Sequence, residues 1–310
     1  MVFDLPVTIA IPTIGDNDFV EAALQSALSE LPPDGEIIIS DNASSCPDRL
    51  VALAAQDPLG RVRVLRQAQR LAMADNWNCC LRAARGAHFI LLSDDDVLLP
   101  GFVRATLALL QDPTVGAALT RIQWINEQGR VFWRTPVHPA REHCAEILLG
   151  VFQRRRVVLP CATVFRTADL LAVGGYDAKY GNWADIHAWL AVGARYPALG
   201  WISDCLSQYR ERAQSLTKAI DASAWTTYIN NTLEFATTTF AHRAGPLRKH
   251  GDAYLAYMLA DVQMKRLTGH DMSLRQAFVL WRPMTASLPW LSRGRLALKL
   301  IYLRLLLPTR

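Results

Sequence analysis

The chain has 310 residues, of which 51% are hydrophobic and 20% are charged, and its formal net charge is +5. This composition excludes a disordered chain, and the length allows one large domain or two smaller ones. Residues 271–310 contain seven Arg or Lys and one Asp, a net charge of +6, which leaves a net charge of −1 for residues 1–270. Because the body of the chain is close to neutral, we expect no nucleic-acid partner.

The six cysteines include no C-x-x-C pair, so we expect reduced thiols in a reducing compartment and no zinc site. The first residues lack the basic and apolar regions of a secretory signal, and no run of about 18 apolar residues predicts a membrane span. We therefore expect a cytoplasmic location, with peripheral attachment to the inner face of the cell membrane as an option.

Short β-branched runs alternate with segments of helical spacing through residues 7–111. Strands are predicted at residues 7–11, 36–40, 62–65 and 88–92, and helices at residues 19–29, 47–55, 73–85 and 102–111. This alternation predicts an α/β fold with a mostly parallel, Rossmann-like sheet flanked by helices. The carboxyl ends of parallel strands meet at one edge of the sheet, where ligands bind.

Polar residues come directly after three of these four strands, the first, the second and the fourth. After the fourth strand they include three adjacent aspartates, Asp94 to Asp96. Crowded carboxylates at a buried strand end repel one another unless a cation offsets their charge, and Mg²⁺ or Mn²⁺ would suit oxygen ligands. A solvated acidic turn is the alternative. Asp41 could accept hydrogen bonds from a base or ribose, or could close an Asx turn. The chain has neither a G-x-G-x-x-G nor a G-x-x-x-x-G-K-[ST] motif for phosphates.

Three segments together resemble the family 2 glycosyltransferases of GT-A fold: Val7–Thr13, Glu36–Ser44, and Ser93–Asp96 with Pro100-Gly101. The resemblance implies an inverting transferase that uses a nucleotide-activated sugar and a divalent metal ion. One loop departs from the pattern, because Gln69-Arg70-Leu71 stands where many members have Asn-x-Gly.

The resemblance also implies roles for single residues. The nucleoside would be held by Pro12, Thr13, Asp41 and Asn42. Asp94 and Asp95 would contact the sugars of the donor, and Asp96 together with Asp94 would hold the metal ion. Asn76 matches a further polar position of the family.

Residues 112–220 are less regular, with strands predicted at 115–120 and 161–165, a hairpin of 122–125 with 131–133, and helices at 142–152 and 167–173. Asp185 precedes an amphipathic run and could cap a helix. The resemblance implies that Asp185 is the general base beside Gly174–Asp177, and a helix dipole would keep its carboxylate ionised. Arg210 lies in a segment that resembles the one closing the site, and could neutralise a diphosphate.

Residues 221–310 differ in character from the transferase domain predicted at 1–220. Helices are predicted at 222–242, 246–268 and 274–279. Residues 293–307 alternate basic and apolar side chains with Trp281 and Trp290 nearby, which is typical of an interfacial helix on an anionic membrane surface. A helix packed on the body or a dimer contact is the alternative.

The sequence therefore predicts an inverting glycosyltransferase that moves a sugar from a nucleoside-diphosphate sugar to an acceptor hydroxyl. The acceptor would be a glycan or glycolipid, in surface glycan or polysaccharide assembly. Two alternatives stay open: a nucleotidyltransferase on a related fold, and a non-catalytic membrane-associated scaffold. The loop after the first strand contains Asp16 and Asp18, and their negative charge would repel the triphosphate that a nucleotidyltransferase binds.

Overall fold

A computed structural model of the chain describes residues 3–15, 17–212 and 221–268. The chain divides into two compact units, one of Met1–Ile147 with Arg156–Ser215 and one of Leu148–Arg155 with Leu216–Arg310. The domain boundary predicted after residue 220 adjoins residues that the structure does not describe, and it stays a prediction.

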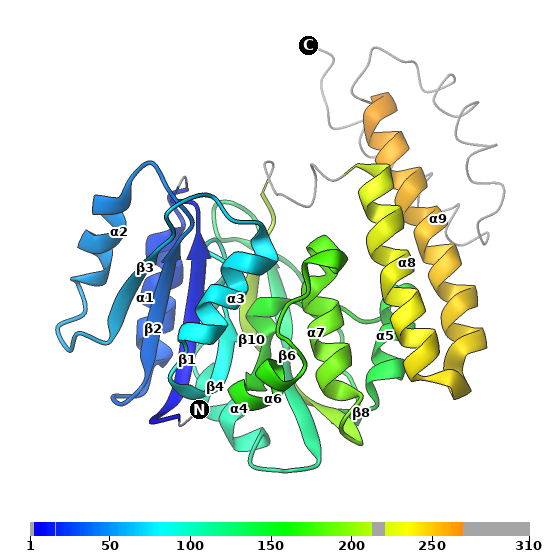
Figure 1. The fold of residues 1–310 in the computed structure, drawn as a ribbon, viewed down its shortest axis with the longest axis horizontal. Coiled ribbons are helices and arrows are strands. Elements are labelled where there is room, and N and C mark those ends of the chain that lie inside the picture. The colour runs from blue at the N-terminus through cyan, green and yellow to red at the C-terminus, as the bar shows by residue number, and fades with distance from the viewer. Residues whose placement is uncertain (1–2, 16, 213–220, 269–310) are drawn as a thin grey trace. The chain divides into compact units, whose positions relative to one another are not determined.

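The first unit is built on one mixed sheet, which has ten strands within the described residues (Figure 1). The strand order is β3-β2-β1-β4-β9-β6-β10-β5, with β7 paired to β6 and β8 paired to β10. The strands are β1 Leu5–Thr13, β2 Glu36–Asp41, β3 Val62–Arg66, β4 Gly86–Leu91, β5 Val97–Leu98, β6 Val115–Ile125, β7 Val131–Arg134, β8 Arg141–Glu142, β9 Thr163–Arg166 and β10 Ala198–Arg210.

Strand directions confirm the predicted, mostly parallel arrangement. Strands β1, β2, β3 and β4 are parallel to one another, whereas β9 is antiparallel to both β4 and β6, and β10 is parallel to β6. The carboxyl ends of β1, β2, β4, β6 and β10 therefore lie at the same edge of the sheet. The strand predicted at 115–120 and the first half of the predicted hairpin are one strand, β6, because β10 pairs with it along both segments.

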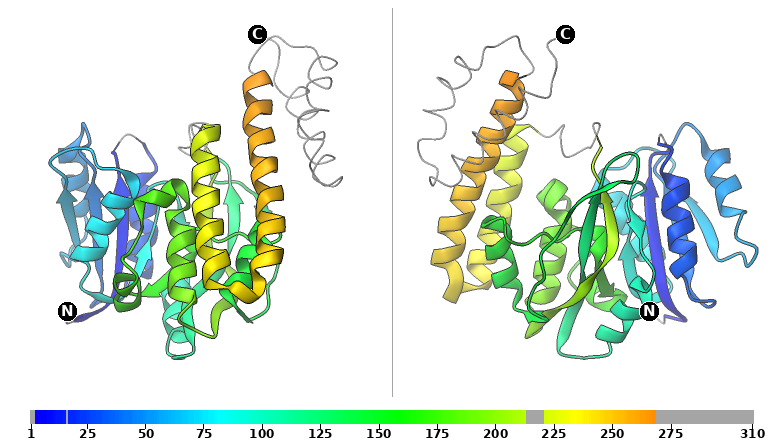
Figure 2. Two further views of the ribbon diagram at one scale, coloured as in Figure 1. Left: turned by 45° about the vertical axis from the view of Figure 1, so that its right-hand side comes forward. Right: turned by 180° about the vertical axis from the view of Figure 1, so that it is seen from behind.

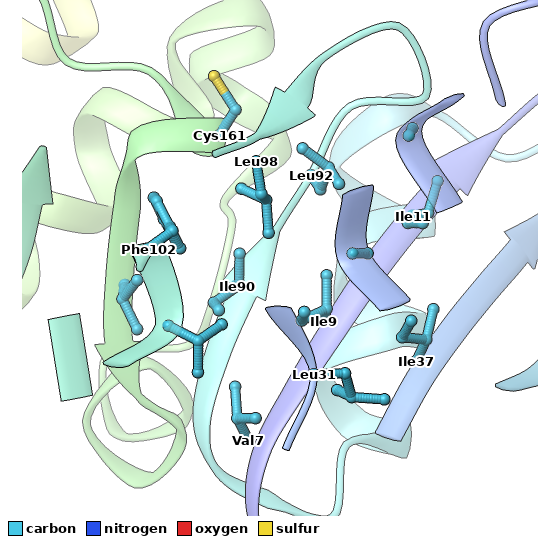
Figure 3. Close-up of a cluster of buried hydrophobic side chains, with 14 of the residues drawn as sticks. Val7, Ile9, Ile11, Leu31, Ile37, Ile90, Leu92, Leu98, Phe102 and Cys161 are labelled. Carbon is cyan, nitrogen blue, oxygen red and sulfur yellow. The ribbon is translucent and has the colours of Figure 1, made fainter. Parts of the chain in front are cut away.

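Helices cover both faces of the sheet (Figure 2). Side chains alternate along β1, so that Val7, Ile9 and Ile11 pack with α1 and α4 in one buried cluster (Figure 3), while α3 covers the other face. Strands buried on both faces need apolar residues at every position, which explains their β-branched sequences. The helices are α1 Val20–Glu30, α2 Pro47–Ala54, α3 Met73–Ala83, α4 Phe102–Leu109, α5 Cys144–Phe152, α6 Thr167–Ala172 and α7 Ala184–Gly193, with 3₁₀ turns at Pro160–Ala162 and Ala178–Trp183.

Among its described residues, the second unit contains the end of α5 from Leu148 on, together with α8 Ala222–Thr239 and α9 Ala244–Thr268, which pack against each other around a short 3₁₀ turn (Figure 1). Gly251 allows the close approach, because a Cβ there would lie 2.3 Å from a methyl carbon of Leu233. The predicted helices at 222–242 and 246–268 are confirmed to within a few residues, whereas 274–279 and 293–307 lie outside the described residues. Within the described ranges, no helix is long and apolar enough to cross a membrane.

Candidate functional site

The loops that follow β1 and β4 are joined through Asp94. The Thr13 hydroxyl and the Asn17 amide, the latter at 2.7 Å, both donate hydrogen bonds to Asp94 Oδ2. Asn17 is itself fixed, because its Oδ1 accepts hydrogen bonds from the backbone N–H groups of Phe19 and Val20 at the start of α1. Desolvation raises the pKa of Asp94, although the hydrogen bond from Thr13 opposes the rise.

The carboxyl group of Asp96 lies inside the protein, and the residue is 1% exposed. Its Oδ1 accepts a hydrogen bond from the backbone N–H of Arg210 at 2.9 Å, which links the acidic loop to the end of β10. Burial raises the pKa of Asp96, and the negative charge of Asp95 raises it further. The thiol of Cys161, from the 3₁₀ turn before β9, is also hydrogen-bonded to this carboxyl group.

Arg210 joins the acidic loop to the turn of the β6–β7 hairpin. Its Nε donates to the carbonyl of Asp95 at 2.9 Å, and its Nη1 donates to the carbonyls of Asn126 and Glu127 at 3.1 and 3.3 Å. The residue is only 7% exposed. Its guanidinium is thus engaged by backbone carbonyls, while the side chain of Asp95 pairs with Arg212 at 3.1 Å.

Asp41 closes a turn at the end of β2. Its Oδ1 accepts a hydrogen bond from the backbone N–H of Ser44 at 2.7 Å, and its Oδ2 forms an ion pair with Arg66. Ala43 between them has φ 55°, a left-handed conformation that is rare for a residue with a side chain. The side chain of Asp41 thus closes a turn to the N–H three residues on, a structural role close to the Asx turn that the sequence left open. This turn lies beside the loop after β1, where the N–H of Asn42 donates to the carbonyl of Thr13 at 2.9 Å.

The two predicted asparagines hold neighbouring segments against β2. The side chain of Asn42 makes hydrogen bonds of 2.8 and 3.0 Å to the backbone of Leu71, which fixes the loop that departs from the family pattern. Asn76, in α3, accepts a hydrogen bond from the Ser40 hydroxyl at 2.7 Å and is 3% exposed. Pro12, which is partly buried, pairs in register with Ser40.

Asp185 lies in the first turn of α7 and is partly buried. The expectation that it caps the helix is wrong, because Trp183 occupies the N-cap position and Asp185 follows the first helical residue. The start of the helix favours the ionised form, as expected, but burial opposes it more strongly. Desolvation raises the pKa of Asp185 to about 7, and backbone N–H groups of the helix start only oppose that rise. Among the described residues, no hydrogen bond connects Asp185 to the network around Asp94 and Asp96.

The sequence interpretation missed Asn78, which fixes the segment next to Asp185. Its side chain donates to the carbonyl of Tyr176 at 2.7 Å and accepts from the N–H of Tyr176 at 2.9 Å. Gly175 has φ +74°, and a Cβ there would lie 2.3 Å from Asn78 Oδ1. Burial raises the pKa of the Tyr176 hydroxyl, and the charge of Asp185 contributes to the rise. A polar residue one turn into the predicted helix at 73–85 was the available signal, but its partner is 98 residues away.

The acidic loop offers the kind of donors that a divalent cation needs. Among the described residues there is no group of three or more His, Cys, Asp or Glu arranged to hold a metal ion. However, Mg²⁺ commonly takes only one or two carboxylates and completes its shell with water and substrate phosphates. Asp94 and Asp96 are desolvated carboxyl groups with raised pKa values and a third acid between them. A hard cation would offset that charge, so these residues fit Mg²⁺ or Mn²⁺.

A separate cavity of about 420 Å³ opens at the opposite edge of the sheet, beside the first residues of β4. It is lined by Ala87, His88, Arg166 and Tyr196 among others. The Arg166 guanidinium donates to the carbonyls of Val115, Leu110 and Asp112. This cavity is therefore not part of the site formed by the strand ends.

A family model described as "Glycosyl transferase family 2" matches residues 8–171. "Uncharacterized protein MT1568" of Mycobacterium tuberculosis (strain CDC 1551 / Oshkosh) is 28% identical over 228 residues, which are 70% of each protein. S. aureus TarS 1-349 in complex with UDP-GlcNAc superposes with a TM-score of 0.61 over 97% of this chain and 88% of that chain, at 13% identity. The mannosyltransferase PcManGT from Pyrobaculum calidifontis, in complex with GDP-Man and Mn²⁺, gives a TM-score of 0.62 over 98% and 88%, at 17% identity.

Proposed function

The chain belongs to glycosyl transferase family 2 and has the GT-A fold, and on this basis we propose that it moves a sugar from a nucleoside-diphosphate sugar to an acceptor hydroxyl with inversion at the anomeric carbon. The observation that carries the proposal is the network at the carboxyl edge of the sheet. Thr13 and Asn17 fix Asp94 there, and the backbone of Arg210 fixes Asp96. Such an edge is where open α/β sheets bind ligands. TarS and PcManGT, which share the fold, carry UDP-GlcNAc and GDP-Man respectively.

Asp185 acts as the general base in this proposal. It takes the proton of the acceptor hydroxyl as the oxygen attacks the anomeric carbon, and the bond to the diphosphate breaks on the opposite side. A base is most effective when its pKa lies near the working pH, and the pKa of Asp185 is raised to about 7. Proton transfer of this kind contributes about 10²- to 10⁴-fold to the rate.

The donor lies along the carboxyl edge of the sheet. Pro12, Thr13, Asp41 and Asn42 border the nucleoside, with Asn76 behind them, and Asp94 and Asp95 contact the sugars of the donor. Asp41 is satisfied by Ser44 and Arg66, so a nucleobase would share or replace those partners. A contact of Arg210 with the diphosphate would require its guanidinium to leave the backbone carbonyls that it now binds.

Asp94 and Asp96 hold Mg²⁺ or Mn²⁺ in this proposal. When bound, the ion supplies positive charge that stabilises the departing nucleoside diphosphate. The third carboxylate of the loop, that of Asp95, pairs with Arg212 at 3.1 Å, and its negative charge adds to the local charge that a cation would offset. Because Asp94 and Asp96 must lose their protons to bind a cation, their raised pKa values make ion binding weaker in acid.

The acceptor in this proposal is a glycan or glycolipid of surface polysaccharide assembly. The basic composition of residues 271–310 supports an acceptor at an anionic membrane surface on the cytoplasmic side.

A thermal-shift panel of UDP-, GDP- and dTDP-sugars, each with and without Mn²⁺, tests the donor class. A donor present at about 100 times its Kd should raise the Tm by about 5–10 °C by mass action, and only when Mn²⁺ is present. Asp96→Asn keeps an acceptor for the Arg210 N–H and should abolish the Mn²⁺-dependent part of the shift. The matched control is Asp204→Asn, the same chemical change at an exposed carboxylate. A panel without any shift in Tm would refute the donor proposal. If the Tm rose only when nucleoside triphosphates replaced the sugar nucleotides, the result would favour a nucleotidyltransferase.

A further inference from the structure

Three large apolar side chains are exposed close together on the β6–β7 hairpin and the loop that follows it. Phe132 and Trp133 in β7 are 56% and 44% exposed, and Val137 is 66% exposed. Elsewhere in the described part of the chain, Val51 and Leu59 are comparably exposed, at 56% and 65%, on α2 and the turn after it. A cluster of exposed apolar groups marks an interaction surface, whereas scattered ones are ordinary.

The exposed side chains stand on a well-supported base. Trp133 meets Trp124 edge to face with ring centroids 4.8 Å apart, and Trp124 contacts Tyr209 of β10 at 5.1 Å. The loop is held as well, because the N–H of Thr135 donates to the carbonyl of Ile122 at 3.0 Å. The ring of Trp133 is thus held in its exposed position by packing, and the loop after it by a backbone hydrogen bond.

Basic residues flank this surface. Arg130 and Arg134 stand on either side of Phe132 and Trp133, both are exposed, and neither forms an ion pair within the described residues. From residue 127 to residue 138 the sequence contains one acid, Glu127. The surface combines aromatic groups with positive charge, as interfacial membrane-binding segments do.

The geometry of β7 distinguishes among the classes of partner. Within the described strands β7 pairs only with β6, so its other edge is open. The pairing register of β7 with β6 shifts between Trp133 and Val131, so Phe132 is the extra residue of a bulge next to Trp133 on the open strand. A protein partner would need a matching groove. The Trp133, Trp124 and Tyr209 rings are inclined by 75° and 54° to one another, so they offer no flat platform for a sugar. A lipid headgroup layer can deform around both rings.

We propose that residues 130–137 dock edge-on against an anionic lipid surface, with Phe132, Trp133 and Val137 entering the headgroup layer and Arg130 and Arg134 contacting lipid phosphates. Through Arg210, the turn of this hairpin is joined to the acidic loop, so docking sets the carboxyl edge of the sheet near the lipid. The proposal does not depend on the transfer reaction. It also differs from the membrane contact predicted for residues 293–307.

The test is cosedimentation of the full chain with vesicles of phosphatidylcholine containing 30% phosphatidylglycerol, and with vesicles of pure phosphatidylcholine. We expect wild type to favour the anionic vesicles, and the double variant F132S/W133S to lower the partition coefficient at least about tenfold. The matched control V51S/L59S, which also replaces two exposed apolar residues, should stay within about twofold of wild type. R130S/R134S leaves the rings in place and should remove most of the preference for anionic vesicles.

Three results would overturn the proposal. The first is a wild-type protein that sediments with neither vesicle type. The second is an F132S/W133S variant that binds as wild type does, which would locate binding elsewhere in the chain. The third is light scattering without lipid that shows a wild-type dimer and an F132S/W133S monomer, in which case the surface joins two copies. If F132S/W133S melts well below wild type, R130S/R134S decides the question, because surface arginines contribute little to folding.

Discussion

Replacing Asp185 with asparagine should stabilise the protein at alkaline pH while removing its transferase activity. Desolvation raises the pKa of this carboxyl group from 3.8 to about 7, so the folded protein disfavours its ionised form. One pKa unit corresponds to about 1.4 kcal/mol, which gives roughly 4 kcal/mol as an upper limit. Because Asp185 is partly exposed, solvent screening lowers the expected effect to about 1–3 kcal/mol.

The size of the stability difference between Asp185→Asn and wild type depends on pH. Below pH 4 the carboxyl group is protonated in both the folded and the unfolded protein, so it has no ionisation penalty. Between pH 4 and pH 7 it ionises in the unfolded protein but stays largely protonated in the folded one, and the penalty grows to its full size. The amide of the Asp185→Asn variant does not ionise and carries no such penalty, so the difference in stability between the variant and wild type should increase across that range.

Thermal melts of wild type and Asp185→Asn at pH 4, 5.5, 7 and 8 measure this directly. The variant should melt about 3–8 °C higher than wild type at pH 8 and at the same temperature at pH 4. Asp204→Asn, at an exposed carboxylate, should follow wild type at every pH. Donor hydrolysis or transfer, assayed on the same samples, should fall at least about 10²-fold in Asp185→Asn.

A Tm difference that is the same at all pH values, or a variant less stable than wild type at pH 8, would refute the argument from desolvation. Retained activity in Asp185→Asn would refute its assignment as the general base, whatever the melting curves show. The two parts of the reasoning can therefore fail separately.

Wild-type kcat/KM for sugar transfer should rise about tenfold from pH 6 to pH 8, because the ionised fraction of a base with a pKa of about 7 rises from about a tenth to about nine-tenths; a flat profile would exclude Asp185 as the titrating group. Asn78→Ala should lower the free energy of unfolding by about 1–3 kcal/mol, since it leaves the N–H and the carbonyl of Tyr176 without their partner, and urea titration would measure the loss. Gly175→Ala should destabilise the protein by at least about 1 kcal/mol more than Gly174→Ala, because both glycines have positive φ but only a Cβ on Gly175 would meet Asn78; equal effects in the two variants would show that the contact is unimportant.

Local sequence was sufficient for much of the fold. The β-branched runs predicted the four parallel strands to within two residues at each end. Strands β1, β2 and β4 are mostly buried, which favours apolar side chains, whereas β3 at the end of the strand order is only partly buried and contains two arginines. The polar residues directly after β1, β2 and β4 were correctly expected at one edge, because parallel strands leave no other arrangement for their carboxyl ends. The sequence prediction divided strand β6 into two strands, at 115–120 and 122–125. The strand is continuous because it pairs along both segments with β10, which follows about 80 residues later.

The sequence by itself determined which chemistry the edge of the sheet can offer, because residue type and strand position suffice to bring Thr13, Asp41 and the acidic loop together. Only the tertiary structure decided which groups those side chains bind and how they ionise. Arg66 pairs with Asp41 across 25 residues, Asn78 holds Tyr176 across 98, and the N–H of Arg210 reaches Asp96 across 114. The raised pKa of Asp185 also depends on tertiary structure, because the segments that pack around this residue remove water from its carboxyl group. The sequence near residue 185 does not predict that burial.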